Sequence, residues 1–181
     1  METIIKTLNL TQQKTAYKLL GLSAVLFLVP ITFSNQWLIG SLANASFIIS
    51  LFILKPKSVW PLAFIPSLSA LSVGLLPIIL APAIPLIIIA NLIFIFSFYV
   101  SYKSLGQNYS SYWLALFISA SLKFIFLSLA WQFVNNLLDL KISNFIVKML
   151  NYPQFYTAFI GGIIAYILIF KLFKNKGKNA I

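Results

Sequence analysis

The chain of 181 residues contains no cysteine, no histidine and no arginine, and its only acidic residues are Glu2 and Asp139. Without cysteine it can form no disulfides, no thiolate zinc sites and no cysteine-ligated iron–sulfur clusters. Without histidine, and with so few carboxylates, histidine triads and paired-acid catalysis are also excluded. We therefore expect a protein that is not an enzyme and that holds no metal or cofactor.

Charge of either sign is scarce, since only 8% of the residues are charged and 61% are hydrophobic. An ordinary soluble domain has about 25% charged residues, and its surface depends on them. A disordered chain would be polar instead of apolar. The composition therefore predicts an all-α protein that crosses a membrane several times, because a spanning segment must satisfy its own backbone hydrogen bonds.

Six apolar runs are long enough to be membrane-spanning helices, each of which needs about 20 residues. We expect a bundle of six transmembrane helices with these approximate bounds: 16–33, 36–54, 59–76, 83–102, 109–134 and 152–173.

The lysines indicate which way the bundle is oriented. All 13 basic residues are lysines, and they give a formal net charge of +11. If the N-terminus is cytoplasmic, ten lysines lie at inner ends of spans, Lys141 and Lys148 lie outside, and Lys123 falls within a span. We expect both termini in the cytoplasm, a multi-pass protein of the cytoplasmic membrane, and no nucleic-acid partner. The tryptophans fall at span ends, where they would form aromatic belts: Trp37, Trp60, Trp113 and Trp131.

We expect a single integral membrane domain over residues 1–181, with a cytoplasmic N-terminal segment at 1–15 and a basic cytoplasmic tail at 174–181. A cleaved signal peptide is not expected, because a polar stretch precedes the first run and no Ala-x-Ala site follows it. Residues 135–150, NNLLDLKISNFIVKML, have apolar side chains at helical spacing. They predict a short amphipathic outer helix, which would lie in the membrane interface or form a lid over a cavity.

One charged residue is not explained by topology. An ionisable side chain at the centre of a span costs roughly 2.5–3.5 kcal/mol, and Lys123 lies well inside the fifth run. Asn44 and Asn91 lie in the outer halves of two other runs, and Gln154 and Tyr156 open the sixth. We predict an outward pocket with Lys123 as the partner of an anionic or carbonyl-bearing ligand. Alternatively, each asparagine could simply hydrogen-bond a neighbouring helix, and Gln154 could cap the sixth span.

Small residues indicate where helices approach closely. Gly161 and Gly162, with Ala165, would admit a neighbouring backbone. The glycine pair is not part of a phosphate-binding loop, because no GxxxxGK[ST] pattern surrounds it.

Four stretches together resemble the S components of energy-coupling factor transporters, in particular small S-component-like proteins of unassigned substrate. The similar regions lie between residues 40 and 165: GSLANASFIISLFIL (40–54), LAPAIPLIIIANLIFIFSFY (80–99), SLKFIFL (121–127) and YPQFYTAFIGGIIA (152–165).

This resemblance implies a membrane-embedded subunit that binds a vitamin or another micronutrient from outside and then topples in the membrane. Its partners would be a transmembrane coupling subunit and two ATPase subunits. The family often contacts the coupling subunit through an AxxxA pattern in the first span. Here the corresponding stretch reads AYKLLGLSA (16–24), with Leu20 in the place of the central alanine.

The residues also suggest two other classes of protein. A membrane scaffold or assembly protein would bind proteins and would have no solute pocket around Lys123. An intramembrane enzyme would need a reactive pair such as Lys123 and Ser128, but residues five apart face different sides of a helix. We therefore expect solute binding, with the scaffold as the alternative.

Overall fold

Long helices make up most of the chain. The computed structural model describes residues 2–75, 84–137 and 144–172, and all regular structure within these ranges is helical. The long helices are α1 (Glu2–Thr32), α2 (Gln36–Ile53), α5 (Ile84–Ser104), α6 (Tyr109–Leu137) and α7 (Asn144–Tyr166). A π-helix, η3 (Ile167–Leu172), continues from α7.

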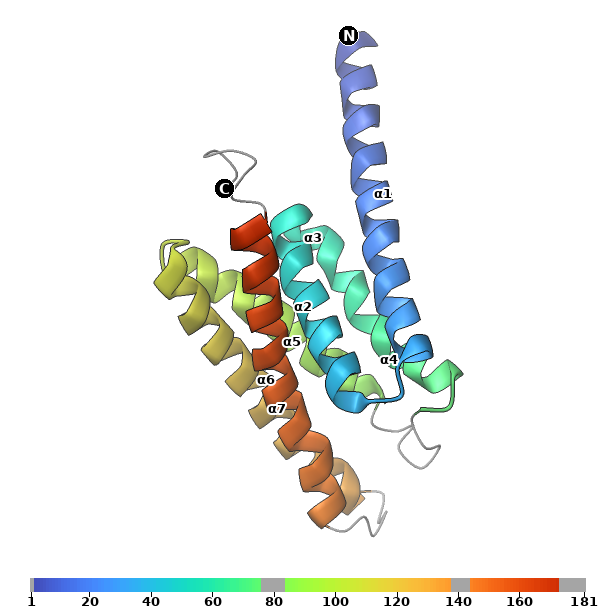
Figure 1. Cartoon of the computed structure of the whole chain (residues 1–181), viewed down its shortest axis with the longest axis vertical. Helices are drawn as coiled ribbons and strands as arrows, with labels where there is room; N and C mark the ends of the chain where they lie inside the picture. The colour runs from blue at the N-terminus through green and yellow to red at the C-terminus, as the bar shows by residue number, and fades with distance from the viewer. Residues whose placement is uncertain (1, 76–83, 138–143, 173–181) are drawn as a thin grey trace.

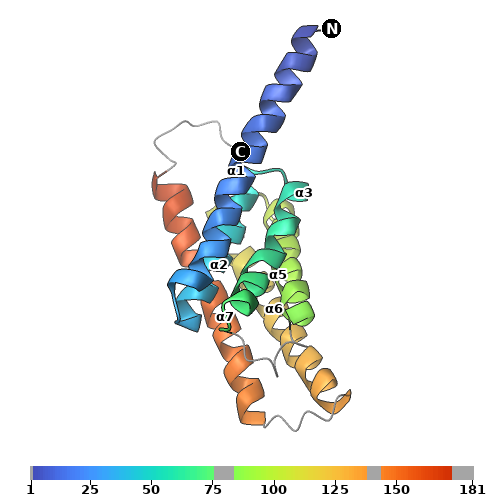
Figure 2. The ribbon, with the colours of Figure 1, turned by 90° about the vertical axis from the view of Figure 1, so that its right-hand side faces the viewer.

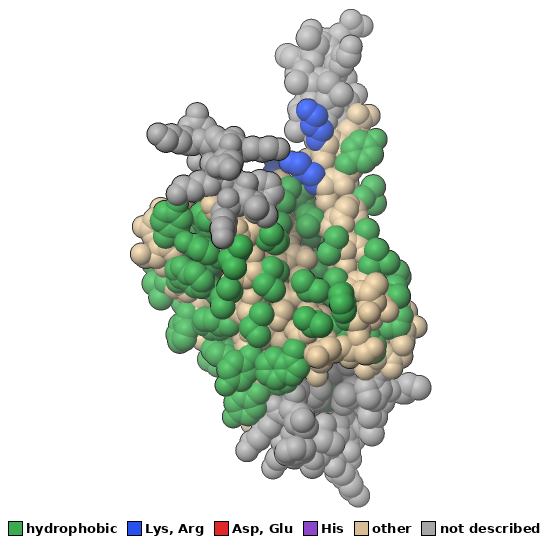
Figure 3. Space-filling model, viewed as in Figure 1, with side chains coloured by type: hydrophobic (Ala, Val, Ile, Leu, Met, Phe, Trp, Pro, Cys, Tyr) green, Lys and Arg blue, Asp and Glu red, His purple; other side chains and the backbone are tan. Residues whose placement is uncertain are grey.

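Five of these helices contain segments that are long and apolar enough to cross a membrane. They are Gln12–Thr32, Gln36–Ile53, Ile84–Ser104, Tyr109–Val134 and Tyr152–Phe170. By length and composition, these segments match five of the six predicted spans and are consistent with a multi-pass membrane protein. In the space-filling view, apolar side chains cover much of the visible face, whereas lysines gather at the end from which α1 projects (Figure 3).

The prediction of one long helix over residues 59–76 was wrong. The chain instead forms three consecutive short helices: α3 (Pro56–Val59), η1 (Trp60–Phe64), which is a 3₁₀-helix, and α4 (Ile65–Ser72). Pro56, Pro61 and Pro66 each occupy one of the first two positions of a piece. Proline has no backbone N–H and clashes with the preceding turn, so each proline begins a new helix and prevents the previous one from continuing.

A glycine ends α4. Gly74 adopts a positive φ of 70°, which a residue without a Cβ tolerates readily. The N–H of Leu75 donates to the Ala70 carbonyl at 3.0 Å, and the N–H of Gly74 donates to the Leu71 carbonyl at 3.1 Å. This pair of bonds is the Schellman arrangement that satisfies the last carbonyls of a helix.

Two expected segments are parts of longer helices. The polar residues at 2–15 continue without a break into the rest of α1. Residues 135–137 end α6 and residues 144–150 begin α7, so the separate amphipathic helix predicted over 135–150 was wrong for these residues. Residues 138–143, and the predicted basic tail at 174–181, lie outside the described residues.

The helical segments run up and down a single bundle. Figures 1 and 2 show α1, α2, the α3–η1–α4 series, α5, α6 and α7 alternating in direction, so that α1 begins and α7 ends at the same end. In the bundle α2 packs against α7, α6 packs against both α5 and α7, and α1 packs against α2 and α4. The first part of α1 projects beyond the other helices (Figure 1).

The glycine pair of α7 lies where two helix crossings meet, and the predicted close approach of a neighbouring backbone is confirmed at Gly161. A Cβ built at Gly161 would be 2.5 Å from the backbone oxygen of Ser41 in α2. A Cβ built at Gly162 would be 2.3 Å from a methyl carbon of Leu116 in α6. Gly40 approaches α7 in the same way, because its Cβ would be 2.8 Å from the Thr157 hydroxyl oxygen. Only glycine allows α7 to pack this closely on α2.

A side-chain hydrogen bond joins α4 to α1. The buried Ser69 hydroxyl donates to the Phe27 carbonyl at 2.6 Å. We expect Ser69→Ala to lower the free energy of unfolding by about 1 kcal/mol, the usual contribution of such a bond between membrane helices. Thermal unfolding in one detergent would measure it. Ser72→Ala is the matched control, because the Ser72 hydroxyl donates only within α4, to the Ser69 carbonyl at 2.8 Å. An equal loss from both substitutions would contradict the assignment.

Candidate solute-binding site

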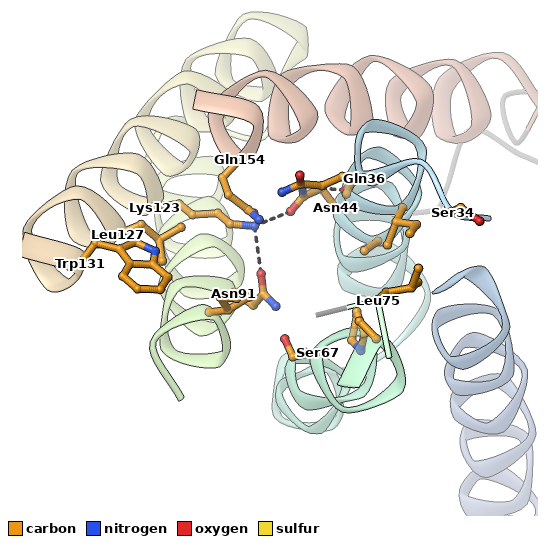
Figure 4. A pocket seen from close by; sticks show the side chains of 16 residues that line it. Ser34, Gln36, Asn44, Ser67, Leu75, Asn91, Lys123, Leu127, Trp131 and Gln154 are labelled. Atoms are coloured by element: carbon orange, nitrogen blue, oxygen red, sulfur yellow. Dashed lines mark hydrogen bonds between the residues drawn. The ribbon is translucent and has the colours of Figure 1, made fainter. Parts of the chain in front are cut away.

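The Lys123 ammonium group connects three helices inside the bundle. From α6 it donates one hydrogen bond to the Asn44 Oδ1 atom of α2 and one to the Asn91 Oδ1 atom of α5, each at 2.9 Å (Figure 4). The exposed fractions of Lys123, Asn44 and Asn91 are only 2%, 1% and 4%. The sequence prediction that these three polar residues from separate spans lie together is therefore confirmed.

Each asparagine is held with its oxygen toward the lysine. The Asn44 Nδ2 atom donates to the Gly40 carbonyl one turn earlier in α2, at 2.8 Å. The Asn91 Nδ2 atom donates across to the Ala63 carbonyl in η1, at 3.2 Å. The residue three positions after Ala63 is Pro66, which has no N–H to form a 3₁₀-type bond with that carbonyl. The proline break in the third segment thus helps to position a residue of the site.

The ammonium group has polar partners but no described counter-charge. The amides are neutral, and the Phe94 ring, whose centroid is 5.4 Å from the Nζ atom, offers only the attraction of its π face. The chain's two carboxylates, on Glu2 and Asp139, are not among the side chains that the structure describes. Within the described part of the chain, the buried Lys123 amino group therefore has no anionic partner.

A cavity of about 360 Å³ adjoins this cluster. Its volume falls in the usual range for small-molecule pockets, about 300–1,000 Å³. Most of its lining is apolar, and its polar residues lie both at the buried Lys123 cluster and at the exposed Ser34 and Gln36. The lining residues are Ser34, Gln36, Ile39, Gly40, Ala43, Asn44, Pro66, Ser67, Ala70, Leu75, Ile87, Asn91, Lys123, Leu127, Trp131 and Gln154.

Four of the five predicted site residues line the cavity. Lys123, Asn44 and Asn91 form its buried polar end, and Gln154 of α7 also contributes to its wall (Figure 4). Tyr156 does not line it. This side chain is 51% exposed, and its ring lies 6.0 Å from that of Trp37, centroid to centroid. Tyr156 is two residues after Gln154, and residues two apart face different sides of a helix.

Trp131 was assigned to the wrong environment by its position near the end of a span. It is only 3% exposed and lines the cavity, whereas Trp37, Trp60 and Trp113 are between 39% and 47% exposed. Lys123, Leu127 and Trp131 are spaced four residues apart on α6, so their side chains share one face. This spacing was the signal that could have identified Trp131 from the sequence.

Ser67 is a second lining residue that the site prediction missed. It is 4% exposed, its hydroxyl points into the cavity (Figure 4), and it has no hydrogen-bond partner among the described residues. A buried hydroxyl without a partner is costly, because burial removes its hydrogen bonds to water. A bound molecule could supply the missing partner. No cluster of three or more histidine, cysteine or carboxylate side chains that could hold a metal occurs among the described residues.

Comparisons of the chain with known protein families, with curated proteins and with solved structures found no match. The functional conclusion therefore depends on the chemistry of the cavity and on the sequence resemblance described above.

Proposed function

We propose that this protein is the membrane-embedded substrate-binding subunit of an ATP-driven importer, and that it captures a small vitamin or other micronutrient from the outer side of the cytoplasmic membrane. The observation that carries the proposal is the cavity with Lys123, Asn44 and Asn91 at its buried end. A charged group in a membrane helix is costly and usually marks a functional site. A scaffold protein would have no need of such a pocket, so the cavity favours solute binding over that alternative.

Lining residues at the ends of three helices support capture from outside. Ser34 follows the end of α1, Gln36 begins α2, and Leu75 follows the end of α4. These positions lie at the end of the bundle opposite the one from which α1 projects (Figure 1). The opposite end of the bundle, from which α1 projects, carries exposed lysines: Lys14 lies in α1, Lys55 follows the end of α2, and Lys103 lies near the end of α5. By the positive-inside rule, that end would be cytoplasmic.

The importer would need partners, because the sequence contains no phosphate-binding loop of its own. The ATPase subunits would supply ATP hydrolysis, and a transmembrane coupling subunit would contact this chain. The first helix offers small exposed residues for such a contact, namely Ala16, Gly21 and Ala24. A Cβ built at Gly21 meets no atom within 4 Å, which leaves room for another helix.

The proposed function is tested by purifying the tagged full-length chain from its native membrane under mild conditions. Bound proteins and extracted small molecules would both be identified by mass spectrometry. We expect a coupling subunit, ATPase subunits and one enriched small molecule. An unrelated membrane protein of similar size, purified in parallel, is the control for non-specific material. Repeated purification with neither ATPase subunits nor an enriched molecule would overturn the proposal.

Solute binding is expected to change the fluorescence of one particular tryptophan. Trp131 lines the cavity, whereas Trp113 lies on the surface and is 39% exposed. Titrating the recovered solute into the wild-type protein should alter the emission, and Trp131→Phe should remove most of that change. Trp113→Phe should preserve it. If the two variants responded alike, the solute would not be bound in this cavity.

A further inference from the structure

We infer that the solute is a small organic acid with a single carboxylate, which forms an ion pair with the Lys123 ammonium group. The rest of the solute is uncharged and largely apolar, and it contacts Leu127 and Trp131. This inference depends on the proposed solute-binding function and narrows the class of molecule that the cavity accepts. It follows from three features of the site: its charge, its unpartnered polar groups and its size.

The charge of the site calls for one negative charge on the ligand. Among the described residues that line the cavity, Lys123 is the only ionisable one, and its two hydrogen-bond partners are neutral amide oxygens. A monoanion would neutralise the buried ammonium group. A cation would add a second buried positive charge, and a dianion would leave one negative charge unpaired, which is costly at this depth. One carboxylate therefore fits better than an amine, a phosphate or a dicarboxylate.

The available hydrogen-bond donors match a carboxylate and one further acceptor. An ammonium group has three N–H bonds, and the asparagine oxygens accept two of them. The buried Ser67 hydroxyl and the indole N–H of Trp131 also have no acceptor among the described residues. Figure 4 shows Ser67, Asn91, Lys123 and Trp131 arranged around the same space. A molecule rich in acceptors would satisfy these donors.

Size and polarity define the body of the ligand. At about 30 Å³ per water molecule, a cavity of about 360 Å³ has room for about a dozen waters, and hence for a ligand with a similar number of non-hydrogen atoms. Apart from its few polar groups, the lining consists of residues such as Ile39, Ala43 and Leu127. The indole of Trp131 adds a flat surface on which a planar group can stack.

The first test identifies the carboxylate on the natural solute. Small molecules extracted from the purified protein would be methylated with a reagent that esterifies carboxylic acids, and their masses compared before and after. We expect the enriched molecule to gain the mass of one CH₂ unit, because a methyl group replaces its single carboxylic proton. A molecule that gains none, or more than one, would overturn this inference and leave the proposed function standing. A long-chain fatty acid from the membrane would also overturn it.

The second test uses synthetic probes and needs no natural solute. The probes are 3-phenylpropionate, its amide, 3-phenylpropylamine and phenylsuccinate, which share a similar apolar body and differ in charge. We expect 3-phenylpropionate to bind the purified wild-type protein about tenfold more tightly than the others, by calorimetry, because only it leaves no buried charge unpaired. Equal or tighter binding of the amide or the amine would overturn the inference. Failure of every probe, together with no recovered molecule, would count against solute binding itself.

An isosteric substitution separates the charge from the shape of the site. Asn91→Asp keeps the side chain's size but places a carboxylate 2.9 Å from the Lys123 Nζ atom. We expect the substitution to weaken the binding of 3-phenylpropionate at least about tenfold and to remove the protein's preference for the acid over the amide. Thermal unfolding would verify that the variant is folded, and Asn91→Ser, which leaves the site's charge unchanged, is the control. Retained preference for the acid in a folded Asn91→Asp protein would contradict the inference.

Discussion

Replacing Lys123 with methionine is expected to weaken solute binding by about a hundredfold or more while the protein remains folded. Removing one member of a buried charge pair usually costs about 2–5 kcal/mol of binding free energy, and 1.4 kcal/mol corresponds to a factor of ten. The variant would lose the one ionisable side chain among the described residues that line the cavity. Equilibrium binding of the solute recovered from wild-type protein would measure the loss.

The stability of the Lys123→Met protein is expected to change much less than its affinity. Two opposing effects are of similar size. The substitution leaves the Asn44 and Asn91 oxygens without their donor, at a cost of about 1–3 kcal/mol each. It also removes a buried charge that costs roughly 2.5–3.5 kcal/mol to place in a membrane helix. Thermal unfolding in the same detergent would test this balance.

Lys103 provides the matched control. It lies near the end of α5, where it is exposed to solvent and its Nζ atom is 5.8 Å from the centre of the Tyr99 ring. Lys103→Met removes the same charge from the chain but leaves the cavity intact, so solute affinity should be unchanged. Wild-type affinity in a folded Lys123→Met protein would show that the solute is not held by this ammonium group.

The polar cluster could be predicted from the sequence because its members are rare. In an apolar span, a lysine or an asparagine is costly unless it finds a partner, so residues at similar depths in different spans are expected to meet. Depth alone does not give the rotation of a helix about its axis. For this reason Trp131 was predicted to lie in an aromatic belt and Tyr156 to line the pocket. In the structure Trp131 lines the cavity, and Tyr156 is exposed on the surface. The four-residue spacing of Lys123, Leu127 and Trp131 carries the missing rotational information.

The third apolar segment shows a different limit of sequence analysis. Its hydropathy predicts a spanning helix, but Pro56, Pro61 and Pro66 divide it into short pieces. The prolines are plain in the sequence, since each disfavours continuation of the preceding helix. What could not be predicted is the consequence for the site. The carbonyl of Ala63, at the junction of two pieces, accepts the hydrogen bond that orients Asn91, and this contact between residues 28 positions apart depends on tertiary packing.

Gly161 offers the largest expected structural effect of a single substitution. We expect Gly161→Leu to destabilise the folded protein by about 3 kcal/mol or more and to abolish solute binding. Even a Cβ atom there would lie 2.5 Å from the Ser41 backbone oxygen and 2.8 Å from both the Ala45 nitrogen and the Asn44 Cβ atom. Backbone atoms cannot turn aside as a flexible side chain can, so α2 would have to move away from α7.

This movement would reach the site through Asn44, whose oxygen must lie within hydrogen-bonding distance of Lys123. Gly161→Ala should show the same effects to a smaller degree, and Gly21→Ala is the control because its added methyl group meets no atom within 4 Å. Alanine is also the better helix former, so Gly21→Ala should leave thermal stability unchanged or raise it slightly. Equal stability and affinity in the Gly161 and Gly21 alanine variants would contradict the close α2–α7 contact. Loss of both only at Gly161 would support a site whose geometry depends on two helices in backbone contact.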